Sequence, residues 1–106
     1  MKSIIKGKTV LVTGGTGSIG QVLVEKVVKF GAKKIIVFSN DENGLYEMES
    51  SFSNNSKIQY IIGDIRDPDT VSSLVKGIDI VFHAAALKHV DRCESIPFEA
   101  VTVNIL

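Results

Sequence analysis

The sequence is poor in residues that mark several classes of protein. It has one cysteine, Cys93, no tryptophan and two prolines in 106 residues. A single cysteine excludes an intrachain disulfide framework and a zinc site built on cysteine pairs. Lys and Arg together number 12, as do Asp and Glu, so the formal net charge is zero. Without a basic surplus, we do not expect a sequence-independent nucleic-acid binder.

Long hydrophobic runs are also missing. No apolar stretch approaches the roughly 18 residues that a membrane span needs. The start of the chain, residues 1–7, is too short and too interrupted for a signal peptide. The hydrophobic content of 44% still supplies a buried core, and the length limits that core to one small domain. We therefore expect a protein of the cytoplasm.

Four short apolar runs alternate with segments of helical periodicity. The runs cover residues 9–13, 34–38, 58–62 and 78–83. Their near-continuous apolar character is typical of strands that are buried on both faces. The alternation predicts βαβ units with right-handed crossovers. The predicted fold class is α/β, a Rossmann-like doubly wound parallel sheet of which the chain holds the N-terminal four βα units.

Local signals predict where the first two helices begin and end. Apolar residues recur at steps of three and four from Ile19 to Phe30, and Gly31 follows as a stop. After the second strand, Asp41 and the two residues before it can cap a helix that runs to about Ser50.

The later helices have similar signals. A capping Asp67 followed by Pro68 predicts a helix start, and Gly77 predicts its end. The chain is helix-prone from Ala84, with a break near Pro97. We expect the helix to resume through residue 105, so that Asn104 lies on it. There its amide either turns inward toward the site or lies on the helix surface.

The glycine cluster between the first strand and the first helix carries the clearest chemical signal. Gly15, Gly17 and Gly20 match G-x-G-x-x-G, and Gly14, Gly17 and Gly20 match a spaced variant. The glycines allow a tight turn and a close approach of a pyrophosphate to the helix N-terminus. The strand before and the helix after are the required context. A purely structural turn is the alternative.

The end of the second strand bears on the choice of cofactor. NAD-binding proteins usually carry an acidic residue there, which bonds a ribose hydroxyl. Here the position is Ser39, followed by Asn40 and Asp41. A small hydroxyl leaves room for a 2′-phosphate, which favours NADP over NAD, although no Arg is adjacent. In the alternative, Ser39 and Asp41 only cap the next helix and Asp41 takes the ribose.

Two further strand ends carry candidate cofactor contacts. After the third strand, the Asp64 carboxylate can accept from an adenine amino group and Ile65 can lie against the ring; a turn Asp is the alternative. After the fourth strand, the small residues Ala84, Ala85 and Ala86 let a cofactor pass close by, unless they serve tight packing.

The residues that follow are harder to assign. Lys88 is expected to contact cofactor or substrate, with a solvated surface position as the alternative. For His89 we expect a local structural role, and for Cys93 a packed position rather than a nucleophile. No set of residues has convincing metal-ligand spacing, and we assign no catalytic residue and no metal site.

Several motifs together resemble a known superfamily. They are TGGTGSIG from Thr13, GDIRD from Gly63 and HAAA from His83. From residue 10 to the end, the chain is similar to the amino-terminal part of an extended short-chain dehydrogenase/reductase. A narrower resemblance, to the inverting UDP-N-acetylglucosamine 4,6-dehydratases of polysaccharide biosynthesis, rests on VFSNDE from Val37 with Glu47-Met48, AALKHV from Ala85, and ESIPFEAV from Glu94 with Asn104.

This resemblance implies a site for NADP. The residues that it assigns to the cofactor are Thr16, Gly17, Ser18 and Ile19, the segment 39–44, Asp64, Ile65, Ala84 and Lys88. The family usually has Arg after the Ser, whereas this chain has Asn40, which weakens the expected grip on a 2′-phosphate. The implied reaction removes hydride from C4 of a UDP-sugar, eliminates water across C5 and C6, and returns the hydride to C6.

The family's catalytic residues have no match here. Its Tyr-x-x-x-Lys pair is missing, because Tyr46 and Tyr60 are followed four places on by Ser50 and Asp64. We therefore expect residues 1–106 to be the N-terminal part of an NAD(P)-binding domain, without catalytic and substrate regions and without dehydratase activity alone. A nucleotide-sugar substrate for the longer protein and a homo-oligomer are expected. Another sugar-nucleotide epimerase or reductase, or a non-enzymatic dinucleotide-binding module, are the alternatives.

Overall fold

The computed structural model describes residues 2–14, 16–52, 55–84 and 102–105. Its strands form one sheet in the order β3-β2-β1-β4-β5. The three pairings among the first four strands are parallel, and β5 joins β4 antiparallel. The strands are β1 (Thr9–Thr13), β2 (Lys34–Ser39), β3 (Ile58–Ile62), β4 (Ile80–His83) and β5 (Thr102–Ile105).

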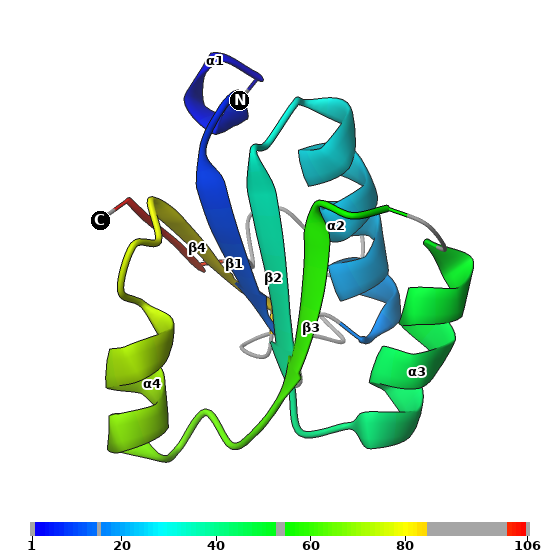
Figure 1. Ribbon diagram of the computed structural model, residues 1–106, viewed down its shortest axis with the longest axis vertical. Coiled ribbons are helices and arrows are strands. Elements are labelled where there is room, and N and C mark those ends of the chain that lie inside the picture. Colours follow the sequence, from blue (N-terminus) through cyan, green and yellow to red (C-terminus); the bar gives the residue numbers. More distant parts are fainter. Residues whose placement is uncertain (1, 15, 53–54, 85–101, 106) are drawn as a thin grey trace, which may run out of the picture.

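Helices cover both faces of this sheet. They are α1 (Lys2–Ile5), α2 (Ser18–Lys29), α3 (Glu42–Ser51) and α4 (Pro68–Leu74). The helices α2 and α3 lie on one face, and α4 lies on the other (Figure 1). The predicted α/β fold with a Rossmann-like parallel sheet is therefore confirmed. The short α1 was not predicted.

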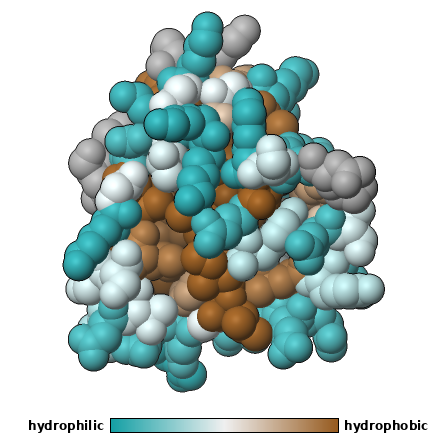
Figure 2. Space-filling model, in the orientation of Figure 1, coloured by the Kyte–Doolittle hydropathy of each residue, from teal (hydrophilic) through white to brown (hydrophobic). Residues whose placement is uncertain are grey.

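Alternation along the central strands divides the core in two. Val10 and Val12 of β1 belong to the cluster that packs under α2 and α3, together with Leu23 and Met48. Leu11, between the two valines, belongs to the cluster on the α4 face. The α4 face is less completely covered. Figure 2 shows apolar side chains gathered in its middle, over the region between α4 and β3 of Figure 1.

The predicted helix ends are confirmed by their capping geometry. Gly31 follows α2 with a φ of +86°, which only glycine adopts easily. The Asp41 carboxylate accepts from the Gly44 N–H at 3.0 Å and caps α3. Asp67 caps α4, with Pro68 at the first helical position. Sequence-local capping chemistry thus sets these boundaries.

The helix predicted through Asn104 is wrong. Residues 102–105 form β5, in which Asn104 pairs with Val81 of β4. Three of these four residues are Thr, Val and Ile, whose branched side chains favour strands over helices. The edge of β4 offers unpaired backbone groups for such a segment. The predicted break near Pro97 lies outside the described residues.

Candidate functional site

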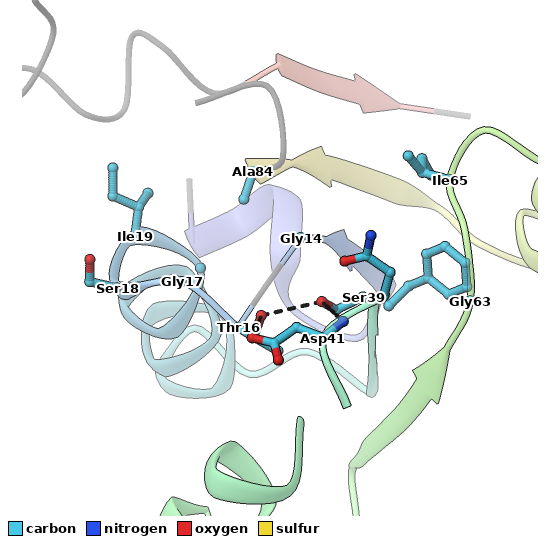
Figure 3. Close-up of a pocket in the computed structure, with 13 residues that line it drawn as sticks. Gly14, Thr16, Gly17, Ser18, Ile19, Ser39, Asp41, Gly63, Ile65 and Ala84 are labelled. Atoms are coloured by element: carbon cyan, nitrogen blue, oxygen red, sulfur yellow. Dashed lines mark hydrogen bonds between the residues drawn. The ribbon is translucent and has the colours of Figure 1, made fainter. Parts of the chain in front are cut away.

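A cleft opens where the parallel strands end. Its volume is about 460 Å³, which is typical of small-molecule sites. It lies beside β1, from which the chain order runs to β2 and β3 on one side and to β4 on the other. Parallel sheets bind ligands at such a switch point. The lining residues, most of them labelled in Figure 3, are Gly14, Thr16, Gly17, Ser18, Ile19, Gly20, Phe38, Ser39, Asn40, Asp41, Gly63, Ile65 and Ala84.

The loop after β1 leaves the start of α2 open to this cleft. Gly14 has a φ of +68°, and its N–H donates to the Phe38 carbonyl oxygen at 2.7 Å. Gly17 is the N-cap of α2 and supplies no side-chain cap. A Cβ placed on Gly17 would meet nothing within 4 Å. The first N–H groups of α2 therefore face free space, which fits an anion such as a pyrophosphate.

Thr16, Ser39 and Asp41 form a hydrogen-bonded group that lines the cleft. The Thr16 and Ser39 hydroxyl oxygens are 3.2 Å apart (Figure 3). The Asp41 N–H donates to Ser39 Oγ at 3.0 Å, and the Thr16 hydroxyl donates to an Asp41 carboxylate oxygen at 3.4 Å. Ser39 is buried, whereas Asp41 is exposed. The group connects the glycine loop, the end of β2 and the start of α3.

Gly44 lies close against this group. A Cβ on Gly44 would stand 2.8 Å from the Cβ of Thr16 and would collide with the Asp41 carboxylate. The first turn of α3 therefore packs tightly on the glycine loop, and only glycine fits there. The sequence resemblance included Gly44 in a segment that holds the cofactor but gave no reason for a glycine.

Phe38 and Gly63 form a second close contact in the wall. A Cβ on Gly63 would stand 2.7 Å from Cε1 of the Phe38 ring. Phe38 is almost fully buried, and it lines the cleft. Phe38 was not among the predicted site residues, because an apolar residue near the end of a buried strand looks like any other core residue. Ile65 and Ala84 line the cleft nearby, and their contact with a cofactor stays a prediction.

Asp64 does not line the cleft as its neighbours do. Its carboxylate accepts from Arg66 Nη2 at 2.9 Å and from the Arg66 backbone N–H at 2.8 Å. The hydrogen bonds from the Arg66 side chain lower the pKa of Asp64, with a further contribution from the backbone bond. The turn that the sequence left as an alternative is thus present. Contact with an adenine amino group stays a prediction.

A polar pair joins β1 and β4. The Thr13 hydroxyl is hydrogen-bonded to Nδ1 of His83, and Thr13 is fully buried. This bond satisfies a hydroxyl that would otherwise be costly to bury. This bond was not predicted, because the two residues are 70 positions apart in the sequence.

Some predicted site residues lie outside the described part of the chain. They are Ala85, Ala86, Lys88, His89 and Cys93, so their roles stay predictions. Across residues 2–14, 16–52, 55–84 and 102–105, no three His, Cys, Asp or Glu side chains come together as metal ligands. In the same ranges, no helix is both long and apolar enough to cross a membrane.

Fold and cleft together define a Rossmann-type α/β protein whose second helix begins, without a side-chain cap, at the switch point of its sheet. The family described as polysaccharide biosynthesis protein matches residues 10–106. The chain belongs to this family.

Three relatives show how far the similarity extends. An uncharacterized membrane protein of Methanocaldococcus jannaschii is 48% identical over all of this chain and 32% of its own length. A UDP-glucose 4-epimerase of Rickettsia bellii is 45% identical over 93% of this chain and 30% of its own length. An inverting UDP-N-acetylglucosamine 4,6-dehydratase of Campylobacter jejuni is 41% identical over 96% of this chain and 30% of its own length. The chain thus spans about a third of each relative, and the predicted resemblance to the dehydratases is confirmed.

Solved structures agree with the fold. Pen from Bacillus thuringiensis superposes with a TM-score of 0.76 at 45% identity, over 92% of this chain and 31% of its own. Two further structures are 22% identical to the chain, which supports the fold alone. The Bordetella bronchiseptica enzyme WbmF in complex with NADH matches with a TM-score of 0.61, over 78% of this chain and 24% of its own. Pseudomonas aeruginosa RhlG with NADP matches with a TM-score of 0.59, over 74% of this chain and 34% of its own. Neighbours of this fold thus bind either form of the cofactor.

Proposed function

We propose that this chain is the dinucleotide-binding part of an enzyme that modifies a UDP-sugar, as a UDP-N-acetylglucosamine 4,6-dehydratase does. The observation that carries the proposal is the uncapped start of α2, which faces the cleft across Gly17. The relatives named above support the sugar-nucleotide substrate, because a dehydratase of this kind is 41% identical to the chain.

In this proposal each wall of the cleft holds one part of the cofactor. The N–H groups of Ser18, Ile19 and Gly20 would donate hydrogen bonds to the pyrophosphate. Gly14 and Gly17 have no side chain and would let the pyrophosphate approach the backbone of the loop. Ser39, Asn40 and Asp41 would flank the adenosine ribose. Asp64 and Ile65 would lie at the adenine, and Ala84, Ala85, Ala86 and Lys88 would continue toward the nicotinamide. The bound cofactor would accept and return the hydride of the sugar.

A UDP-sugar 4-epimerase is the second candidate, because the Rickettsia bellii relative is 45% identical over a similar stretch. The two activities are separated by incubating the full-length protein with UDP-N-acetylglucosamine and UDP-glucose and analysing the products by mass spectrometry, together with NMR spectroscopy to distinguish an epimer from unreacted substrate. A dehydratase product is lighter by one water, whereas an epimer has the mass of its substrate. If neither sugar changes, a non-enzymatic dinucleotide-binding module becomes the better description.

Binding of the cofactor is tested separately from turnover. Calorimetric titration of the protein with NAD and with NADP should give saturable binding of at least one of them. Absence of binding to both would contradict the proposal. We further propose that the protein works in the cytoplasm as a homo-oligomer, which light scattering of the purified protein would test.

A further inference from the structure

The cleft disagrees with the NADP that the sequence resemblance implies. Of its thirteen described lining residues, Asp41 is the only one with an ionisable side chain, and none is Lys, Arg or His. A 2′-phosphate carries additional negative charge on the adenosine ribose, and it would need cations or free N–H donors at this wall. The described wall offers a carboxylate instead.

The polar groups at the end of β2 are already engaged with one another. Ser39 Oγ is buried, accepts from the Asp41 N–H at 3.0 Å, and lies 3.2 Å from the Thr16 hydroxyl. The Asp41 carboxylate accepts from the Gly44 N–H at 3.0 Å. A backbone donor of α3 that could bind a phosphate is thus used by an acidic side chain. Glu42, in the same turn, does not line the cleft.

The packing leaves little room to supply a cation from this turn. Any side chain at Gly44 would meet the Cβ of Thr16 at 2.8 Å and collide with the Asp41 carboxylate. The next residue along the wall, Asn40, is neutral. Arg66, on the loop after β3, is paired with Asp64 at 2.9 Å.

We infer that the cleft selects NAD over NADP, with the Asp41 carboxylate accepting a hydrogen bond from the adenosine ribose and repelling a 2′-phosphate. The inference rests on the proposed function, since it concerns the same cofactor. Asp41 is suited to this role because its own hydrogen bonds to Gly44 and Thr16 hold it at the rim of the cleft. A carboxylate held in place discriminates better than a mobile one.

The test is calorimetric titration of the purified protein with NAD and NADP at low ionic strength. NAD should bind at least about tenfold more tightly, because two like charges a few ångströms apart repel strongly at a protein surface. Added salt should reduce the difference between the two Kd values, because it screens that repulsion. If NADP binds equally or more tightly, for example through Lys88, the inference fails while the proposed function stands. If neither binds, both fail.

Two variants connect the selectivity to Asp41. Asp41→Asn removes the negative charge and keeps a good capping residue. In this variant the Kd values for NADP and NAD should differ by no more than about threefold. Asn40→Arg should strengthen NADP binding without touching the cap. Glu42→Gln, which removes the neighbouring carboxylate, is the matched control and should largely keep the NAD preference. An unchanged preference in folded Asp41→Asn, verified by circular dichroism, would overturn the inference.

Discussion

Gly17 and Gly63 both lack a side chain for reasons that lie in the cleft, but the reasons differ. Gly17 has open space where a Cβ would stand, and that space lies in front of α2. Gly63 has the Phe38 ring there instead. Under the proposed function, the absent side chain at Gly17 leaves room for the ligand, whereas the absent side chain at Gly63 leaves room for Phe38. Substitution should therefore separate binding from stability.

Gly17→Ala should fold normally and lose affinity for the dinucleotide. The new methyl group meets no protein atom within 4 Å, and an alanine N-cap costs at most about 1 kcal/mol of stability. The methyl would stand where the pyrophosphate must approach α2, so we expect at least a tenfold weaker Kd, or about 1.4 kcal/mol. Calorimetry with NAD and urea unfolding measure the two effects. Unchanged affinity would argue against a pyrophosphate at this helix.

Gly63→Ala should mainly destabilise the fold. Its Cβ would stand 2.7 Å from the Phe38 ring, which is buried and has little freedom to move. Overpacking of this kind costs about 1–3 kcal/mol. Urea unfolding should show this loss in the free energy of unfolding. Gly17→Ala is the comparison, because the glycine that it replaces has open space around it. Equal stability of the two variants would mean that the Phe38 ring moves aside without cost.

The predictability of the site also differs from residue to residue. Gly14, Gly17 and Asp41 were predicted because glycine spacing and capping are local patterns. The contact of Phe38 with Gly63 and the bond between Thr13 and His83 could not be predicted. Both depend on which strands become neighbours, and the sequence alone does not state the strand order.

Among the helices, α4 depends most clearly on its first turn. It has seven residues, and none of them is buried. Leu74 packs, partly buried, against the core on the α4 face of the sheet. The start of the helix is set by Pro68 and by the Asp67 carboxylate, which accepts from the Asp69 N–H at 3.1 Å and from the Thr70 hydroxyl at 2.8 Å. The hydrogen bond from Thr70 lowers the pKa of Asp67 below its ordinary value of 3.8.

This pKa shift makes the stability depend on pH. Because the folded-state pKa is lowered, the stabilisation is present above the ordinary value and is lost as the pH falls through 3.8 and below. Asp67→Asn keeps a capping side chain but cannot titrate, so its urea midpoint should fall less on acidification than that of the unmodified protein. Thr70→Val, which removes the donor, should show a similarly flattened profile. Identical acid profiles for all three proteins would contradict the assignment.

Strands and helices were not equally predictable. The bounds of β1 and β3 follow directly from apolar runs, because both ends of each run are marked by polar residues or glycine. The strand β5 was predicted as part of a helix, because the apolar residues Phe98, Val101 and Ile105 follow one another at steps of three and four. Its antiparallel pairing with β4 is a property of the assembled sheet.

Across the whole molecule, the cleft is a product of the assembled sheet. Its wall comes from the loop after β1, the ends of β2 and β3, and Ala84 after β4. These segments lie together only because β1 is paired with β2 on one side and β4 on the other. An unfolded chain has no such site, so a ligand of this cleft binds the folded state alone.

That dependence predicts a large effect of the cofactor on global stability. A ligand that binds only the folded state at a hundred times its Kd adds about 2.7 kcal/mol to the free energy of unfolding. Urea unfolding with NAD at that excess should show this increase. In Gly17→Ala at the same NAD concentration, it should shrink to about 1.4 kcal/mol if the variant's Kd has risen tenfold, and to about 0.4 kcal/mol if it has risen a hundredfold. An increase that persists undiminished in that variant would place the NAD elsewhere on the molecule, because it could not then depend on the open start of α2.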